Sequence, residues 1–234
     1  MTSRGIIRLC ALSAIVGGLL GLVLTPVSAA AGYNWWGETY YGWSDHVPPL
    51  SKAFRFIVEP MLNLAPRDQV YPTYGRALIF IFFLMLLGVV GLRAAVGLHL
   101  TRRGVIAMRL IFVGLIMQIL GNVGDYWLGY DVLGQPLWGI SFVIGSEVGF
   151  LIYGAGSILL GLALLRQKLL PAWAAWALIV SPPLGILFLF FGVYHIPSSW
   201  VLPISVAWLM VGLALSFQSA NRAIEQTTPA GGQV

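Results

Sequence analysis

Residues 77–92 read ALIFIFFLMLLGVVGL, a run without a single charged or amide side chain. It belongs to a longer apolar stretch, Gly75–Leu100, in which Arg76 and Arg93 flank the run. A helix that crosses a bilayer needs about 20 predominantly apolar residues. A helix on the surface of a soluble domain would show a polar face at every turn, and this run shows none. It therefore predicts a transmembrane helix.

Five further stretches share this length and composition. All six are predicted to be transmembrane spans: Ile6–Ala31, Gly75–Leu100, Gly104–Leu128, Ile140–Leu165, Pro171–Ile196 and Trp200–Phe217. The predicted fold is therefore an all-α polytopic membrane protein, a bundle of about six transmembrane helices with an external aromatic-rich loop. Residues 1–225 form one transmembrane domain, and the polar, Gly-containing tail 226–234 is predicted to be disordered.

The composition excludes a soluble globular protein. Charged residues make up 9% of the chain and hydrophobic residues 59%, whereas soluble domains contain about 25% charged residues. The single cysteine, Cys10, lies in the first span, so neither an internal disulfide nor a dithiol redox site is available.

The basic residues indicate the orientation of the chain. Most of them fall at the start of the chain, at or near alternate turns between spans, or after the last span: Arg4 and Arg8 at the start, Arg93, Arg102 and Arg103 around the second turn, Arg109 at the opening of the third span, Arg166 and Lys168 in the fourth turn, and Arg222 after the last span. The positive-inside rule then predicts a plasma-membrane protein with both termini in the cytoplasm and residues 32–74 outside. The net charge of +5 is explained by this distribution, and no basic patch with stacking aromatics predicts nucleic-acid binding.

The first span has two interpretations. Met1–Arg8 resembles the basic region of a signal peptide, and either Val27-Ser28-Ala29 or Ala29-Ala30-Ala31 offers a small-residue cleavage site. The apolar stretch is longer than the usual ~7–15 residues of a signal sequence. Gly17 and Gly21 also suit close packing against another helix. We expect a retained helix, with a cleaved signal as the alternative.

The loop 32–74 is rich in tyrosine and tryptophan, which favour the membrane–water interface. Within it, Leu50, Phe54, Ile57, Val58 and Met61 recur at helical spacing, and Pro49 suits a first helical turn. The pattern predicts a short amphipathic helix lying on the membrane surface. A lid over a cavity between the spans is the functional alternative.

Two features of the spans concern how helices meet. Small residues recur at intervals of four at Gly145 and Gly149, and at Ser157 and Gly161, which predicts close helix packing. Pro182-Pro183 lies in the middle of the fifth span and is expected to kink or unwind it. A broken helix of this kind could line a transport site.

The polar residues inside the spans are the candidate functional site. Gln118, Asn122 and Asp125 share one helical face of the third span, and the fourth span carries Glu147 and Tyr153. The third and fourth spans are expected to be antiparallel neighbours, with Asn122 or Gln118 bonded to Glu147. Asp125 is expected nearer the wet interface. We call these five residues the polar seam.

The polar seam has two competing interpretations. It is either an interhelical hydrogen-bond lock or a proton or cation site with Glu147 as the titrating group. No motif indicates a cofactor: metal-binding spacings, phosphate loops and a nucleophile elbow are all missing from the sequence. His46 and His195 are expected outside and His99 inside, as interfacial histidines without ligands.

The favoured function is that of a non-catalytic membrane component. It would bind a membrane lipid, another apolar ligand, a partner membrane protein or a second copy of itself through its helix faces. A small proton- or cation-coupled transporter centred on Glu147 is the first alternative. An intramembrane enzyme that depends on Glu147 or His195 is the second.

Overall fold

The computed structural model describes residues 3–36, 47–66 and 69–227. Over these ranges the protein is helical and contains no strand. Six helices are long and apolar enough to cross a membrane, which confirms the predicted all-α, multi-pass class. The predicted tail 226–234 begins at the end of the last helix, and its residues 228–234 lie outside the described ranges.

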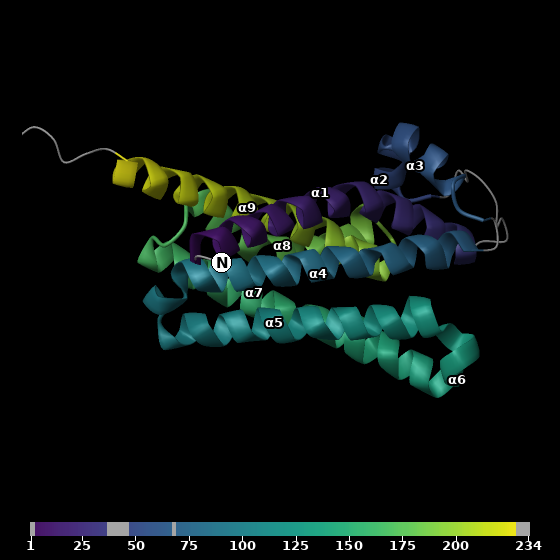
Figure 1. Cartoon of the computed structure of the whole chain (residues 1–234). Coiled ribbons are helices and arrows are strands. Elements are labelled where there is room, and N and C mark those ends of the chain that lie inside the picture. Colours follow the sequence, from purple (N-terminus) through teal and green to yellow (C-terminus); the bar gives the residue numbers. More distant parts are fainter. Residues whose placement is uncertain (1–2, 37–46, 67–68, 228–234) are drawn as a thin grey trace, which may run out of the picture.

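The long helices follow one another as antiparallel rods (Figure 1). Their bounds are α1 Ser3–Trp36, α4 Val70–Val96, α5 Arg102–Asn122, α7 Gly149–Gln167, α8 Ala172–Phe191 and α9 Ile196–Thr227. The shorter elements are α2 Pro49–Ala53, α3 Arg55–Leu62, the 3-10 turn η2 Gly97–His99, the π-helix η3 Val123–Leu128, α6 Gly129–Ile140 and the π-helix η4 Ser141–Val148.

The fourth span starts earlier than the predicted Ile140, because helical structure extends through α6, η4 and α7 from Asp131 to Gln167. The chain reverses at Gly129 and Gly134, whose φ angles of +66° and +70° only glycine adopts readily. Pro136 then lies in the first turn of the returning helix, where its missing N–H costs nothing. Sequence reasoning placed the whole of this region in a turn.

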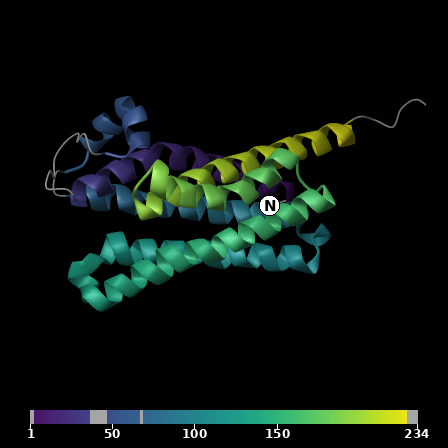
Figure 2. The same ribbon diagram turned by 180° about the vertical axis from the view of Figure 1, so that it is seen from behind.

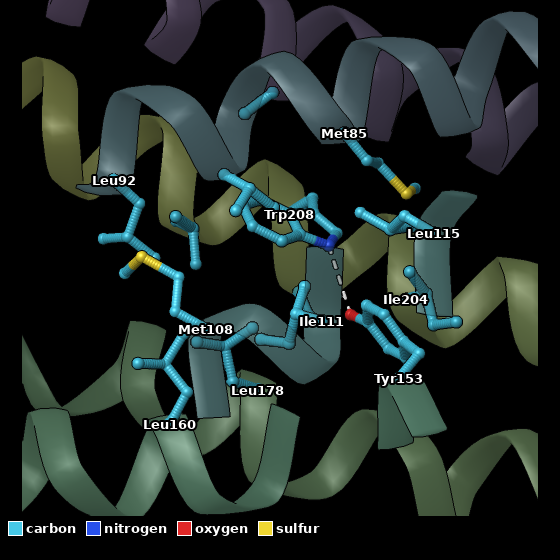
Figure 3. Close-up of a cluster of buried hydrophobic side chains, with 14 of the residues drawn as sticks. Met85, Leu92, Met108, Ile111, Leu115, Tyr153, Leu160, Leu178, Ile204 and Trp208 are labelled. Carbon is cyan, nitrogen blue, oxygen red and sulfur yellow. Dashed lines mark hydrogen bonds between the residues drawn. The ribbon is translucent and has the colours of Figure 1, made fainter. Parts of the chain in front are cut away.

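The six long helices pack in the order α1, α4, α5, α7, α8 and α9, and α9 returns to α1 (Figure 2). Their buried faces form one main core. At its centre the fully buried Trp208 of α9 donates its indole N–H to the Tyr153 hydroxyl of α7 over 3.1 Å. Met85 of α4 and Leu115 of α5 pack around this pair (Figure 3).

The predicted small-residue positions do lie at helix contacts. A Cβ added to Gly17 would lie 2.8 Å from the Cβ of Leu84 on α4, and one added to Gly21 would overlap Ser205 on α9. A Cβ on Gly145 would overlap the backbone of Gly121 on α5, and one on Gly161 would lie 2.6 Å from the Ala175 carbonyl of α8. Glycine at these positions therefore lets the helix backbones approach closely.

The predicted unwinding at Pro182-Pro183 is wrong, because α8 stays helical through both prolines. Pro182 has no N–H for the carbonyl of Leu178 four residues earlier. The hydroxyl of Ser157 on α7 donates to that carbonyl at 2.7 Å, and Ser181 donates to it at 3.4 Å. Hydroxyls of α7 and of α8 itself therefore satisfy the carbonyl that Pro182 frees, in a helix that continues through both prolines.

The bundle has two chemically different ends. The start of α1, the α4–α5 and α7–α8 connections and the end of α9 gather at one end, which we call the basic end (Figures 1 and 2). The opposite end carries α2, α3, α6 and the α8–α9 turn, and we call it the cap end. The arginines and lysines of the inter-span turns thus share one end, in agreement with the predicted pattern. Which end faces the cytoplasm stays a prediction.

The predicted amphipathic segment is helical but divided. Pro49 begins α2 as expected, and Phe54 separates α2 from α3. The Ser51 hydroxyl donates to the Pro26 carbonyl of α1 at 2.7 Å, and the Leu50 N–H donates to the Gly192 carbonyl after α8 at 3.2 Å. The α2 helix is therefore fastened to α1 and to the end of α8.

The C-terminus of α7 allows a test of backbone strain. Lys168 caps this helix in the left-handed conformation, with φ of 52° and ψ of 36°. Because glycine adopts this conformation without a Cβ clash, Lys168→Gly should raise the free energy of unfolding by about 0.5–1 kcal/mol. Unfolding in mixed micelles would measure the change. Lys168→Ala is the matched control, since it removes the same charge but keeps the clash; an equal gain from alanine would contradict the strain argument.

Candidate functional site

Three polar seam residues lie on one buried face, as their spacing predicts. Gln118 and Asn122 of α5 are each 3% exposed, and Asp125 of η3 is 8% exposed. The Gln118 amide donates to the Ser146 carbonyl of η4 at 2.8 Å. The Asn122 amide donates to the Gly75 carbonyl of α4, also at 2.8 Å. The face therefore ties α5 to both of its neighbours through hydrogen bonds to main-chain carbonyls.

Asp125 is placed differently from the prediction. It was expected near the wet interface, but its side chain is buried, and one oxygen accepts a 2.9 Å hydrogen bond from the indole N–H of Trp138 on α6. The reason is that α6 folds back over this end of α5, which the sequence did not indicate. Within the described ranges, Asp125 Oδ2 and the Asn122 Oδ1 are buried without a hydrogen-bond donor.

Glu147 and Tyr153 do not join the other seam residues. The predicted hydrogen bond from Asn122 or Gln118 to Glu147 is wrong, because both amides donate to carbonyls elsewhere. Glu147 of η4 is half-buried and has no hydrogen bond or ion pair with any residue that the structure describes. Tyr153 belongs to the main core through Trp208.

A second polar cluster lies beside Asp125 at the cap end, and sequence reasoning missed it. The Tyr71 hydroxyl of α4 donates to the Tyr126 hydroxyl of η3 at 3.3 Å. Arg76 donates to the Tyr126 carbonyl at 2.7 Å, and its guanidinium lies over the Trp127 ring, 5.6 Å from the centroid. Tyr71 had been assigned to the external loop, since the start of α4 has no apolar periodicity to mark it.

His195 completes this cluster. It follows α8 and is 8% exposed, with its ring edge against Tyr71 at a centroid distance of 5.8 Å. Its Nδ1 lies 2.8 Å from the Ser198 hydroxyl, and a Cβ on Gly32 would overlap the ring. Burial lowers the pKa of His195 to about 4. The imidazole is therefore neutral at pH 7 and serves packing and hydrogen bonding.

Metal binding finds no support in the parts of the chain that the structure describes. They hold no group of three His, Cys, Asp or Glu side chains close enough to share an ion. His46, a conceivable partner of His195 and Asp125, lies outside those parts. The cluster combines the Arg76 guanidinium with the hydroxyls of Tyr71 and Tyr126 and the neutral imidazole of His195, beside the Asp125 carboxyl group.

A larger feature is an apolar groove of about 770 Å³ that runs along α8 from Trp173 to Phe188 and reaches the cap end. It lies between α1 and α8, with α9 as its floor and α2 and α3 across one end; we call it the roofed groove. Its lining includes Pro26, Trp176, Phe188, Pro203 and Met210. Ser181 supplies its only hydroxyl, and that hydroxyl already donates to Leu178. The roofed groove therefore offers dispersion contacts and desolvation to a ligand, and no ionic contact.

The predicted apolar face of the amphipathic segment forms the roof of this groove. Leu50, Phe54, Ile57 and Val58 all line it. On the opposite face of α3, Arg55 and Glu59 form an exposed ion pair at 2.7 Å. This pairing lowers the pKa of Glu59. The segment thus covers the end of a cavity, which is the lid arrangement that the sequence left as an alternative.

Fold and site together define a multi-pass α-helical membrane protein with a lateral apolar groove and a separate polar cluster. Comparison with protein-family models, with curated proteins and with solved structures finds no match to this chain.

The lock interpretation of the polar seam makes a stability prediction. Gln118→Met keeps the approximate volume but removes the donor to Ser146, so it should lower the free energy of unfolding by about 0.6–2 kcal/mol. Glu147→Gln should change it by less than about 0.5 kcal/mol, since Glu147 has no partner in the described structure. Both are measured by reversible unfolding in micelles. If Glu147→Gln lowered the free energy of unfolding more than Gln118→Met does, the interpretation of the polar seam as an interhelical hydrogen-bond lock would be contradicted.

The buried His195 predicts a pH dependence of stability. Its folded pKa of about 4 lies below the ordinary value of 6.5, so folding disfavours the protonated ring. The free energy of unfolding is therefore at its full value above about pH 6.5. As the pH falls toward 4, protonation of His195 in the unfolded chain lowers it by up to about 3 kcal/mol. Unfolding curves at several pH values should show the decline in the natural protein and in the His99→Gln control. His195→Asn should lack it; an unchanged pH profile in that variant would refute the assignment.

Proposed function

We propose that this protein is a non-catalytic membrane component that holds the hydrocarbon chain of a lipid, or of a lipid-like molecule, in the roofed groove. The observation that carries the proposal is an apolar cavity within the spans whose cap end is closed by a fastened helix pair. The proposal narrows the wider set of lipid, apolar-ligand and partner-protein functions that the sequence leaves open.

The dimensions of the roofed groove suit such a chain. Its volume of about 770 Å³ falls within the ~300–1,000 Å³ of typical ligand sites. Trp173 and Phe188 mark its two ends along α8. At 1.5 Å per residue they are separated by about 22 Å along the helix axis, a length suited to an extended hydrocarbon chain that lies parallel to the helices.

The roof favours a lipid chain over a partner helix. A transmembrane helix docked between α1 and α8 would need to continue past both ends of the groove. The α2 helix blocks one end, and it is held there by the hydrogen bonds from Ser51 to Pro26 and from Leu50 to Gly192. A flexible chain can end beneath the roof, whereas a helix about 10 Å wide cannot pass it.

The groove walls are hydrophobic surface that faces the bilayer laterally. Val23 of α1 is 41% exposed and Trp176 of α8 is 54% exposed, so a chain can enter between these helices from the surrounding lipid. Tryptophan provides a broad apolar contact surface at a small cost in side-chain entropy. A hydrocarbon chain in this groove would replace its contacts with mobile neighbouring lipids by contacts with the packed side chains of the groove.

No comparable observation favours the transporter. Glu147 lines neither the roofed groove nor the cavity of about 830 Å³ between α4 and α5. The proton-coupled function centred on Glu147 and the intramembrane enzyme therefore stay predictions, as does association with a partner membrane protein or a second copy.

The proposal is tested with a phosphatidylcholine that carries a photoreactive diazirine in one acyl chain. After reconstitution and illumination, labelled peptides should concentrate in α1, α8 and α9. Ala177→Trp fills the groove and should reduce that labelling about tenfold, since overpacking of this size costs more than about 1 kcal/mol. Leu120→Trp, on the exposed face of α5, is the matched control and should leave it unchanged. Uniform labelling of all membrane-facing helices, or a copurified protein cross-linked in the groove, would overturn the proposal.

A further inference from the structure

A second large cavity lies at the basic end and shares no lining residue with the roofed groove. It has a volume of about 830 Å³ and opens between the end of α4 and the start of α5, with Ile6 of α1 at its edge. Apolar side chains form most of its lining, among them Val90, Met108 and Phe112. Two arginines, Arg93 of α4 and Arg109 of α5, also line it. We call it the arginine cavity.

Both arginines lie inside the membrane-spanning helices. Arg93 precedes the end of its span at His99, and Arg109 lies seven residues, or about 10 Å, inside the start of the span at Arg102. A charged side chain at this depth is costly unless it reaches water, a counter-ion or a lipid headgroup. Both side chains are exposed on the helix surface, so each can extend toward the headgroup region at this end of the bundle.

The protein supplies no counter-ion to these two arginines among the residues that the structure describes. Neither forms an ion pair or a hydrogen bond there. The carboxylates whose side chains are described are Glu59, Asp125, Asp131 and Glu147, and none of them lines the arginine cavity. The cavity is thus a positively charged site on an apolar base, and its complement is an anion with a hydrophobic body.

Exposed apolar side chains surround the arginine cavity. Leu98, in the turn that closes it, is 99% exposed, and Val113 and Phe112 on α5 are also exposed. An exposed apolar patch next to a membrane-spanning segment suits contact with lipid. The exposed Arg102 and Arg103 lie beyond the cavity at the same end and add positive charge at the membrane surface.

We propose that the arginine cavity binds an anionic phospholipid, with the headgroup phosphate between Arg93 and Arg109 and the acyl chains against Val90, Met108 and Phe112. Guanidinium groups pair with phosphate through two parallel hydrogen bonds, and two arginines from different helices can share one phosphate. The bound lipid would link α4 to α5 at the junction where η2 interrupts helical structure. This site is independent of the roofed groove and differs from it in requiring negative charge.

The test uses the full-length protein, delipidated and reconstituted in phosphatidylcholine nanodiscs with or without phosphatidylglycerol. Native mass spectrometry should show retained phosphatidylglycerol, and thermal unfolding should shift upward when it is present. Arg93→Gln and Arg109→Gln should each lower its affinity about fivefold or more. The double variant Arg102→Gln/Arg103→Gln removes more charge from the same end without altering the cavity, and it should bind nearly as well as the natural protein.

The proposal would be overturned if the cavity variants and the Arg102→Gln/Arg103→Gln variant lost the same affinity for phosphatidylglycerol. The lipid would then respond only to the overall charge of the basic end. Retention of phosphatidylcholine to the same extent as phosphatidylglycerol would overturn it as well. So would an acidic partner protein that remains bound after delipidation and protects both arginines. Photo-cross-linking of the unaltered protein with a diazirine phosphatidylglycerol is a second measurement that does not depend on variants. Labelled peptides should come from α4 and α5.

Discussion

Inside a bilayer, each main-chain N–H and C=O must find its partner within the protein, and the rest of this structure depends on that constraint. It makes every span a helix, and it also decides what happens where a helix is disturbed. The Leu178 carbonyl that Pro182 frees is taken by hydroxyls of Ser157 and Ser181. The α8 helix therefore continues through Pro182, with the Leu178 carbonyl bonded to one hydroxyl of α7 and one of α8.

The same constraint accounts for the polar seam. The Gln118 and Asn122 amides lie where no water competes, and each donates to a carbonyl of an adjacent element. Because these bonds join α5 to η4 and to α4, they fix the rotation of α5 within the bundle. The π-helical turns of η3 and η4 lie beside these contacts, in keeping with the tendency of π-turns to occur where helix geometry is specialised.

The two cavities show how a nearly uniform apolar sequence acquires chemically different surfaces. The roofed groove has a hydrocarbon lining and a lid fastened by two hydrogen bonds. The arginine cavity has a similar volume but carries two cations. One therefore suits a neutral chain and the other an anionic headgroup, and the two cavities share no lining residue.

The sequence alone determined the number of spans, the all-α class and the grouping of basic residues, because these follow from the length and composition of each segment. It also identified the apolar face of Leu50, Phe54 and Ile57, and the shared face of Gln118, Asn122 and Asp125, since helical periodicity is local. Only the tertiary structure decided the partners of those faces. It buried Asp125 beneath α6, separated Glu147 from the seam, brought Tyr71 to His195, and set Arg93 beside the same cavity as Arg109. Such contacts depend on the rotation and order of packed helices, and a periodic apolar sequence does not specify either, because almost any face of such a helix can be buried.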